Sequence, residues 1–167
     1  DPSAGVCPDL TMLENLSLAD NKGKPFNLTR AVNRSRIKFY QEQLQALGLG
    51  LEDKMDVKMG SLSGGQRQAV SLLMASMTPL RFLILDEHTA ALDPKTAEVI
   101  MVLTNKIIRE KGLTAMMVTH NLRHAAEYGD RILMMHQGTI VLDRSGEEKK
   151  KTSMEDILLM FNRISTQ

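Results

Sequence analysis

The sequence lacks the features that mark secreted, disulfide-bonded or membrane-spanning proteins. It has a single cysteine, Cys7, which excludes a disulfide framework within the chain and leads us to expect a reducing, cytosolic compartment. The longest nearly uncharged stretch, Ala69 to Leu80, is well short of the ~20 apolar residues that a membrane span needs. The first residues lack a signal-peptide pattern and an initiating methionine, so we expect that the beginning of the chain has been lost.

The chain also lacks a strong net charge and an aromatic surface for nucleic acid. Its 21 basic and 20 acidic residues leave a formal charge of +1, so any polyanion partner must be bound locally. It has no tryptophan, and nothing in it resembles a platform on which bases could stack, so no nucleic-acid partner is predicted. With 43% hydrophobic residues among 167, the composition is that of one compact globular domain.

The first part of the chain carries helical signals. Thr11 and Glu14 have the spacing of a capping box, which predicts a helix through about Leu18. Apolar residues then recur at helical spacing up to Gly48, the expected C-terminal cap: Ile37, Tyr40, Leu44 and Leu47. We therefore predict a helical subdomain over residues 1–80.

From residue 81 onward, strands and helices alternate. The run Phe82 to Leu85 predicts a parallel strand buried on both faces, and Ala115 to Val118 predicts a second buried strand. A helix that Asp93 begins and Gly112 ends is expected between them. A hairpin is expected around Gln137-Gly138, the charged run 147–151 is expected to be a solvated loop, and a helix should resume at Ser153. The predicted class is α/β, with residues 81–167 forming a second domain.

A glycine-rich sequence precedes one predicted helix. Ser63 can cap this helix, while Gly64 and Gly65 allow backbone N–H groups to approach an anion closely. A plain glycine-rich turn is the alternative, and the following Gln66-Arg67-Gln68 favours the anion site.

Polar residues follow the two predicted strands. Asp86 and Glu87 come directly after the first strand, where α/β sheets bind ligands, and His120 follows the second. Asp86 suits Mg²⁺, which prefers oxygen ligands, and Glu87 is placed to polarise a water molecule. Taken singly, these residues could also be a helix cap, a solvated loop end and a surface histidine.

Together these motifs resemble the ATP-hydrolysing subunits of ABC transporters. Leu62-Ser63-Gly64-Gly65-Gln66 is similar to the signature motif, the segment Phe82 to Glu87 to the Walker B strand, Ala91-Leu92-Asp93 to the D-loop, and His120 to the switch histidine. The resemblance covers essentially the whole chain and implies a P-loop NTPase-like core, of which residues 81–167 are the carboxyl-terminal half. His88 departs from the proline that the family commonly has after the glutamate.

The resemblance implies ATP and Mg²⁺ as cofactors, with Glu87 and His120 catalytic and Asp86 at the metal. It implies that Ser63, Gly64, Gly65, Gln66 and Asp93 bind nucleotide across a head-to-tail dimer with a second ATPase subunit. Transmembrane permease subunits would be further partners, which places the protein peripherally on the inner, cytoplasmic face of the cell membrane. The sequence also looks similar to ATPases of bacterial importers of tryptophan, tyrosine or other amino acids.

The 167-residue sequence contains no P-loop. Gly60 and Gly65 have the spacing of G-x-x-x-x-G-K-[ST], but Gln66 and Arg67 replace the lysine and the hydroxyl residue. We therefore expect a truncated chain that is inactive alone. A non-transport ABC-type ATPase of DNA repair or translation and a non-catalytic interaction remnant are the alternatives.

Overall fold

The computed structural model describes residues 5–24 and 31–165. The chain divides into two compact units, residues 1–116 and 117–167. No helix in the described ranges is both long and apolar enough to span a membrane.

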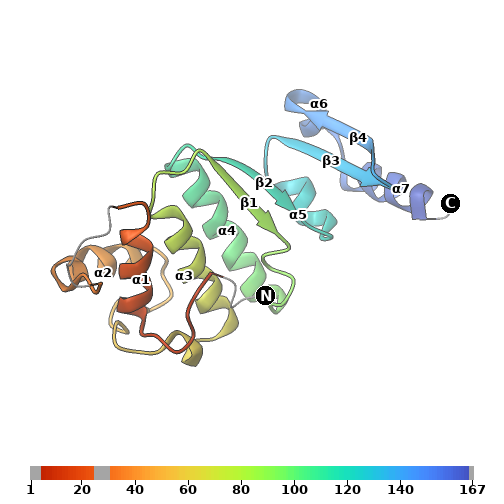
Figure 1. Ribbon diagram of the computed structural model, residues 1–167. Helices are drawn as coiled ribbons and strands as arrows, with labels where there is room; N and C mark the ends of the chain where they lie inside the picture. The colour runs from red at the N-terminus through yellow and green to blue at the C-terminus, as the bar shows by residue number, and fades with distance from the viewer. Residues whose placement is uncertain (1–4, 25–30, 166–167) are drawn as a thin grey trace. The chain divides into compact units, whose positions relative to one another are not determined.

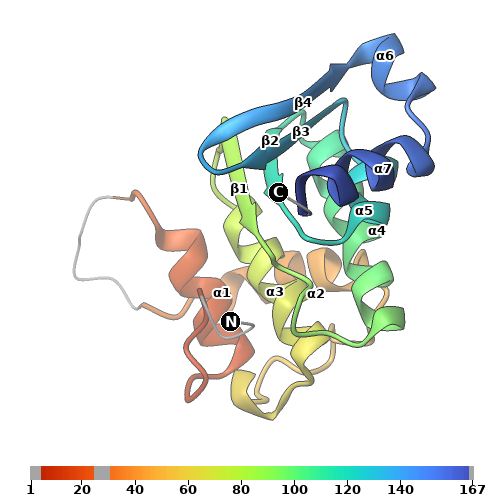
Figure 2. The ribbon, with the colours of Figure 1, turned by 90° about the vertical axis from the view of Figure 1, so that its right-hand side faces the viewer.

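The first unit is built mainly from helices: α1 (Met12–Asn21), the 3₁₀ turn η1 (Arg34–Arg36), α2 (Ile37–Gln45), the 3₁₀ turn η2 (Met59–Ser61), α3 (Gly64–Ser76) and α4 (Pro94–Glu110). The predicted capping box is confirmed, because Thr11 and Glu14 each accept a hydrogen bond from the other's backbone N–H. Helix α3 lies between α1 and α4 (Figures 1 and 2). An apolar core that includes Leu16, Leu44 and Val70 joins α1, α2 and α3.

Strands β1 (Phe82–Asp86) and β2 (Thr114–Val118) are hydrogen-bonded neighbours that run in the same direction (Figure 1). The predicted strands are confirmed, but the burial predicted for β1 on both faces and for β2 was wrong. Phe82 and Ile84 are 50% and 61% exposed, while Leu83 and Leu85 between them are buried. Met116 and Val118 of β2 are about half exposed too. An apolar run only permits two-sided burial, and whether it occurs depends on what packs on each face.

The second unit contains α5 (Leu122–Glu127), β3 (Arg131–His136), β4 (Thr139–Ser145), α6 (Gly146–Lys151) and α7 (Met154–Ser165). The predicted hairpin is confirmed: β3 pairs with β4 in antiparallel fashion, and Gln137 and Gly138 both have positive φ at its turn. Ile132, Leu142 and Ile157 form a small core between this hairpin and α7.

The charged run 147–151 forms helix α6, so its prediction as a loop was wrong. Glu147 and Glu148 lie in the first turn and three lysines lie in the last turn, an order that suits the helix dipole. The ammonium group of Lys149 donates to the carbonyl oxygens of Ala126, Tyr128 and Gly129, each at 2.9 Å. The fold is therefore mixed α/β as predicted, while the domain boundary after residue 80 stays a prediction.

Candidate functional site

The start of α3 has the geometry that its sequence predicts. The hydroxyl of Ser63 accepts a hydrogen bond from the backbone N–H of Gln66 at 3.3 Å, and the side-chain oxygen of Gln66 accepts one from the backbone N–H of Ser63 at 3.2 Å. Gln66 therefore completes a capping box, a role that sequence reasoning did not assign to it. The N–H groups of the first helical turn, at Gly64 and Gly65, have no carbonyl partner within the helix, and their binding of an anion stays a prediction.

Gly65 is also required by packing. A Cβ atom at this position would lie 2.2 Å from Cγ2 of Thr96, and one at Gly64 would lie 3.4 Å from Cδ2 of Leu92. The first turn of α3 therefore packs tightly against Leu92 and Thr96, at the start of α4. The sequence predicted glycine here so that an anion could approach the backbone. The contact with Thr96 gives a second reason for glycine at position 65, because a larger residue would clash with that side chain.

Asp93 is the N-terminal cap of α4, as predicted. Its carboxylate accepts a hydrogen bond from the backbone N–H of Thr96 at 3.0 Å. Hydrogen bonds from the hydroxyl and the backbone of Thr96 hold the pKa of Asp93 below its usual value. Through Thr96, the structure brings Asp93 together with the glycines of α3, while a contact of Asp93 with nucleotide remains a prediction.

Asp86 and Glu87 stand at the carboxyl end of β1. Asp86 is the last residue of the strand and is exposed. Glu87 adopts φ 44, and Gln137 in the hairpin turn is the other residue besides glycine with positive φ in the described ranges. This backbone conformation disfavours non-glycine residues and is concentrated at functional sites. The strain therefore marks the residue that the sequence singles out as catalytic.

The carboxylate oxygens of Asp86 suit a magnesium ion whose other ligands would be water and phosphate oxygens. Among the described residues, no group of three or more His, Cys, Asp and Glu side chains could form a metal cage. Mg²⁺ does not require such a cage, since it retains several waters and is typically bound through one or two carboxylates plus phosphate oxygens. The exposed carboxylate of Asp86 is a ligand of this type, and its binding of Mg²⁺ stays a prediction.

Two supporting residues were missed by sequence reasoning. His88 contacts the hydroxyl of Thr104 on α4 through Nε2 at 3.2 Å, and that hydroxyl donates to the carbonyl oxygen of Ile100 at 2.7 Å. The Thr104 oxygen is thus an acceptor for an Nε2 proton, which ties the loop after Glu87 to α4. The guanidinium group of Arg67 donates a hydrogen bond to the carbonyl oxygen of Leu62, which fixes the segment just before α3. No local sequence pattern identifies either contact.

His120 lies in the second unit, between β2 and α5, and is exposed. The next residue, Asn121, caps α5 by accepting hydrogen bonds from the backbone N–H groups of Arg123 and His124. The expected clustering of His120 with Asp86 and Glu87 stays a prediction.

Comparison with known proteins relates these motifs to ATP-binding cassettes. The family described as ABC transporter matches residues 3–90. A tyrosine transport ATP-binding protein of Clostridioides difficile is 50% identical over 161 residues, which cover 96% of this chain and 64% of the relative. An energy-coupling factor transporter ATP-binding protein of Bacillus cereus is 39% identical over 126 residues, covering 74% of this chain and 42% of the relative. The chain therefore spans less than two thirds of the length of these relatives.

Solved structures agree with this relationship. The dimeric ATP-binding cassette MJ0796, bound to ADP and Pi in a post-hydrolysis state, superimposes with a TM-score of 0.66 at 32% identity, covering 84% of this chain and 58% of that one. An inward-facing metal-chelate type ABC transporter superimposes with a TM-score of 0.71, covering 92% of this chain and 59% of that one, and at 19% identity it supports the fold alone. The signature sequence, the acidic strand end and these matches together show that the chain belongs to the ABC transporter family of ATP-binding proteins.

Proposed function

We propose that this chain provides the signature-motif surface and the hydrolytic strand end of an ATP-hydrolysing transporter subunit. The observation that carries the proposal is the strained backbone of Glu87, directly after Asp86 at the carboxyl end of β1. A strained backbone conformation persists only where the surrounding structure enforces it. Here the carboxylate of Glu87 lies in a loop that the contact of His88 with Thr104 ties to α4. A general base needs such fixed placement.

Each site residue has a role in this proposal. The N–H groups at the start of α3, with Ser63 and Gln66 as their capping pair, bind phosphate oxygens of ATP. Asp86 holds Mg²⁺, which when bound neutralises charge on the phosphates. Glu87 orients and polarises the attacking water, and His120 contacts the γ-phosphate. Asp93 fixes the start of α4 against the signature helix.

The assembly follows from the same proposal. The signature surface of one subunit faces the nucleotide held by a second ATPase subunit, head to tail, and permease subunits contact the helical subdomain of residues 1–80. Residues 81–167 form the carboxyl-terminal half of a P-loop NTPase-like core. The complex acts peripherally at the inner face of the cell membrane. The tyrosine transport relative supports an amino acid as the imported molecule.

The 167 residues alone are proposed to bind ATP poorly and not to hydrolyse it. They contain no G-x-x-x-x-G-K-[ST] sequence, whose backbone and lysine hold the phosphates. Without it, the carboxylates of Asp86 and Glu87 face a polyanion that they repel. Calorimetry of the chain with Mg-ATP is expected to show no binding below millimolar concentrations, and submillimolar affinity would contradict this part of the proposal.

The hydrolytic role is tested in a chimaera. The chain is joined to the part of the C. difficile relative that it does not cover, and Mg-ATP hydrolysis is measured for the chimaera, its Glu87→Gln variant and the control Glu110→Gln. Because a positioned general base contributes about 10²- to 10⁴-fold, Glu87→Gln is expected to lower kcat by at least about 100-fold with ATP still bound. Glu110, exposed at the end of α4, tests for a nonspecific effect of removing a charge. Equal kcat values for the two variants would refute the assignment of Glu87.

A further inference from the structure

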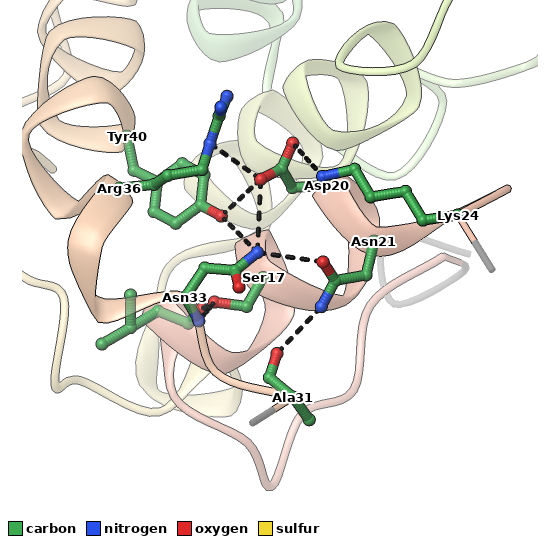
Figure 3. A network of polar contacts seen from close by, with 9 residues as sticks. Ser17, Asp20, Asn21, Lys24, Ala31, Asn33, Arg36 and Tyr40 are labelled. Carbon is green, nitrogen blue, oxygen red and sulfur yellow. Dashed lines mark hydrogen bonds and ion pairs between the residues drawn. The ribbon is translucent and has the colours of Figure 1, made fainter. Parts of the chain in front are cut away.

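A polar network ties the end of α1 to the segment before α2 (Figure 3). The buried carboxylate of Asp20 accepts hydrogen bonds from the Tyr40 hydroxyl at 3.0 Å and from the Asn33 amide at 3.3 Å. Asn33 also donates to the side-chain oxygen of Asn21 at 3.0 Å, and the Asn21 amide donates to the carbonyl oxygen of Ala31. These bonds fix residues 20–24 beside residues 31–36.

The carboxylate of Asp20 also forms ion pairs with two basic side chains. Oδ2 of Asp20 lies 2.8 Å from Nε of Arg36, and Oδ1 lies 3.5 Å from Nζ of Lys24. Both basic side chains remain about half exposed, at 44% and 52%. One negative charge thus holds two positive charges at the surface, which leaves a local excess of positive charge.

Further basic residues lie on the two segments that the network joins. Between Asp20 and Glu42 the sequence has no acidic residue and six basic ones. Five of them are described and exposed, and we call them the basic patch: Lys22, Lys24, Arg34, Arg36 and Lys38. This stretch therefore carries a positive charge that the near-neutral charge of the whole chain does not reveal.

The chemistry of the basic patch favours an anionic lipid surface over a protein partner. A tight protein interface needs buried apolar or aromatic anchors. In the described part of this stretch, Phe39 is the large apolar side chain that stays exposed, and Arg36 covers its ring at 4.3 Å from the centroid. An anionic bilayer needs only several cations close together, and clusters of four to eight Lys and Arg residues bind such surfaces.

We propose that the basic patch docks the chain on anionic phospholipid headgroups, with the Asp20 network as its scaffold. Attraction by each cation falls off within a Debye length, so the patch acts only when it faces the membrane surface. This docking requires neither nucleotide nor permease. The docking proposal can therefore be tested independently of the proposed ATPase function.

The test is cosedimentation of the 167-residue chain with vesicles of phosphatidylcholine, alone or with about 30 mol% phosphatidylglycerol. The main variant is Arg34→Glu with Lys38→Glu, which changes no side chain that bonds within the Asp20 network. The control is Arg81→Glu with Lys106→Glu, the same charge change at exposed positions outside the patch. Circular dichroism verifies that each variant is folded.

The chain is expected to bind the anionic vesicles and not the neutral ones. Each cation near an anionic bilayer contributes about fivefold to partitioning, so the main variant should bind at least about 25-fold more weakly and the control at most a few-fold. Raising NaCl to about 0.5 M should release the chain. Equal binding to both vesicle types, or equal loss in both variants, would overturn the proposal. Tighter binding to single-stranded RNA than to the anionic vesicles would also overturn it, by assigning the patch to another polyanion.

Discussion

Replacement of Gly65 by alanine tests the contact between the start of α3 and the start of α4. The added Cβ would lie 2.2 Å from Cγ2 of Thr96, whereas carbon atoms in contact are about 3.5–4.0 Å apart. One side must therefore move by more than about 1 Å. Thr96 cannot rotate away freely, because its branched Cβ restricts χ1.

The expected loss of stability follows from two opposing terms. Overpacking of this kind costs about 1–3 kcal/mol. Alanine is favoured over glycine within a helix by at most about 1 kcal/mol. We expect Gly65→Ala to lower the free energy of unfolding by about 1–2 kcal/mol.

A second substitution isolates the clash. Thr96→Ser removes Cγ2 and keeps the hydroxyl, and the remaining Cβ of residue 96 would lie 3.6 Å from the new Cβ, an ordinary contact. In this background Gly65→Ala should be neutral or slightly stabilising, which gives a coupling energy of about 1–3 kcal/mol between the two positions. Gly64→Ala is the matched control, because its Cβ would lie 3.4 Å from a flexible end of Leu92.

The assay is urea unfolding of the four proteins of the cycle and of the control, followed by circular dichroism and extrapolated to water. A Gly65→Ala variant as stable as the parent, or one destabilised equally with serine at position 96, would show that Gly65 is not there for packing. The glycine would then be required only for the approach of a ligand.

Three further substitutions test other contacts. Glu87→Gly should be more stable than Glu87→Ala by about 1 kcal/mol in urea unfolding, the reverse of the usual order, because φ 44 favours glycine; the usual order would disprove strain at this residue. Tyr40→Phe should cost about 1.5–3 kcal/mol through the lost bond to Asp20. Burial and Asp20 raise the pKa of Tyr40, so the parent's stability from this group is complete below about pH 10 and is lost as the pH rises toward the folded pKa. If the Tyr40→Phe variant loses as much stability at alkaline pH as the parent does, the loss does not come from Tyr40. Thr104→Val should cost about 1 kcal/mol or more by thermal unfolding, since both His88 and the Ile100 carbonyl lose a partner; an unchanged midpoint would remove His88 as the anchor of the loop.

Local signals in the sequence predicted the elements well. The caps at Thr11, Ser63 and Asp93 start helices in the structure, because a capping side chain bonds backbone groups only two or three residues away. The turn at Gln137-Gly138 was predicted for the same local reason. The motifs also indicated the family correctly, because their order along the chain is a property of the sequence itself.

Two predictions failed where the result depends on distant residues. The burial predicted for β1 on both faces and for β2 was wrong, because a strand's composition does not determine what covers it. The run 147–151 is a helix because its charge order suits the dipole and Lys149 reaches carbonyl oxygens about twenty residues earlier. Neither the covering layer nor the Lys149 contacts can be read from a short window of sequence.

The sequence by itself determined the helix starts, the strands, the family and the residue types at the candidate site, since these depend on chemistry within a few neighbouring residues. Only the tertiary structure decided that Gly65 must be small for Thr96, that Glu87 is held in a strained conformation, and that Asp20 gathers two cations into a surface patch. Each of these depends on a distance or a dihedral angle that the surrounding packing imposes. Such packing is set by the fold as a whole and not by any local pattern.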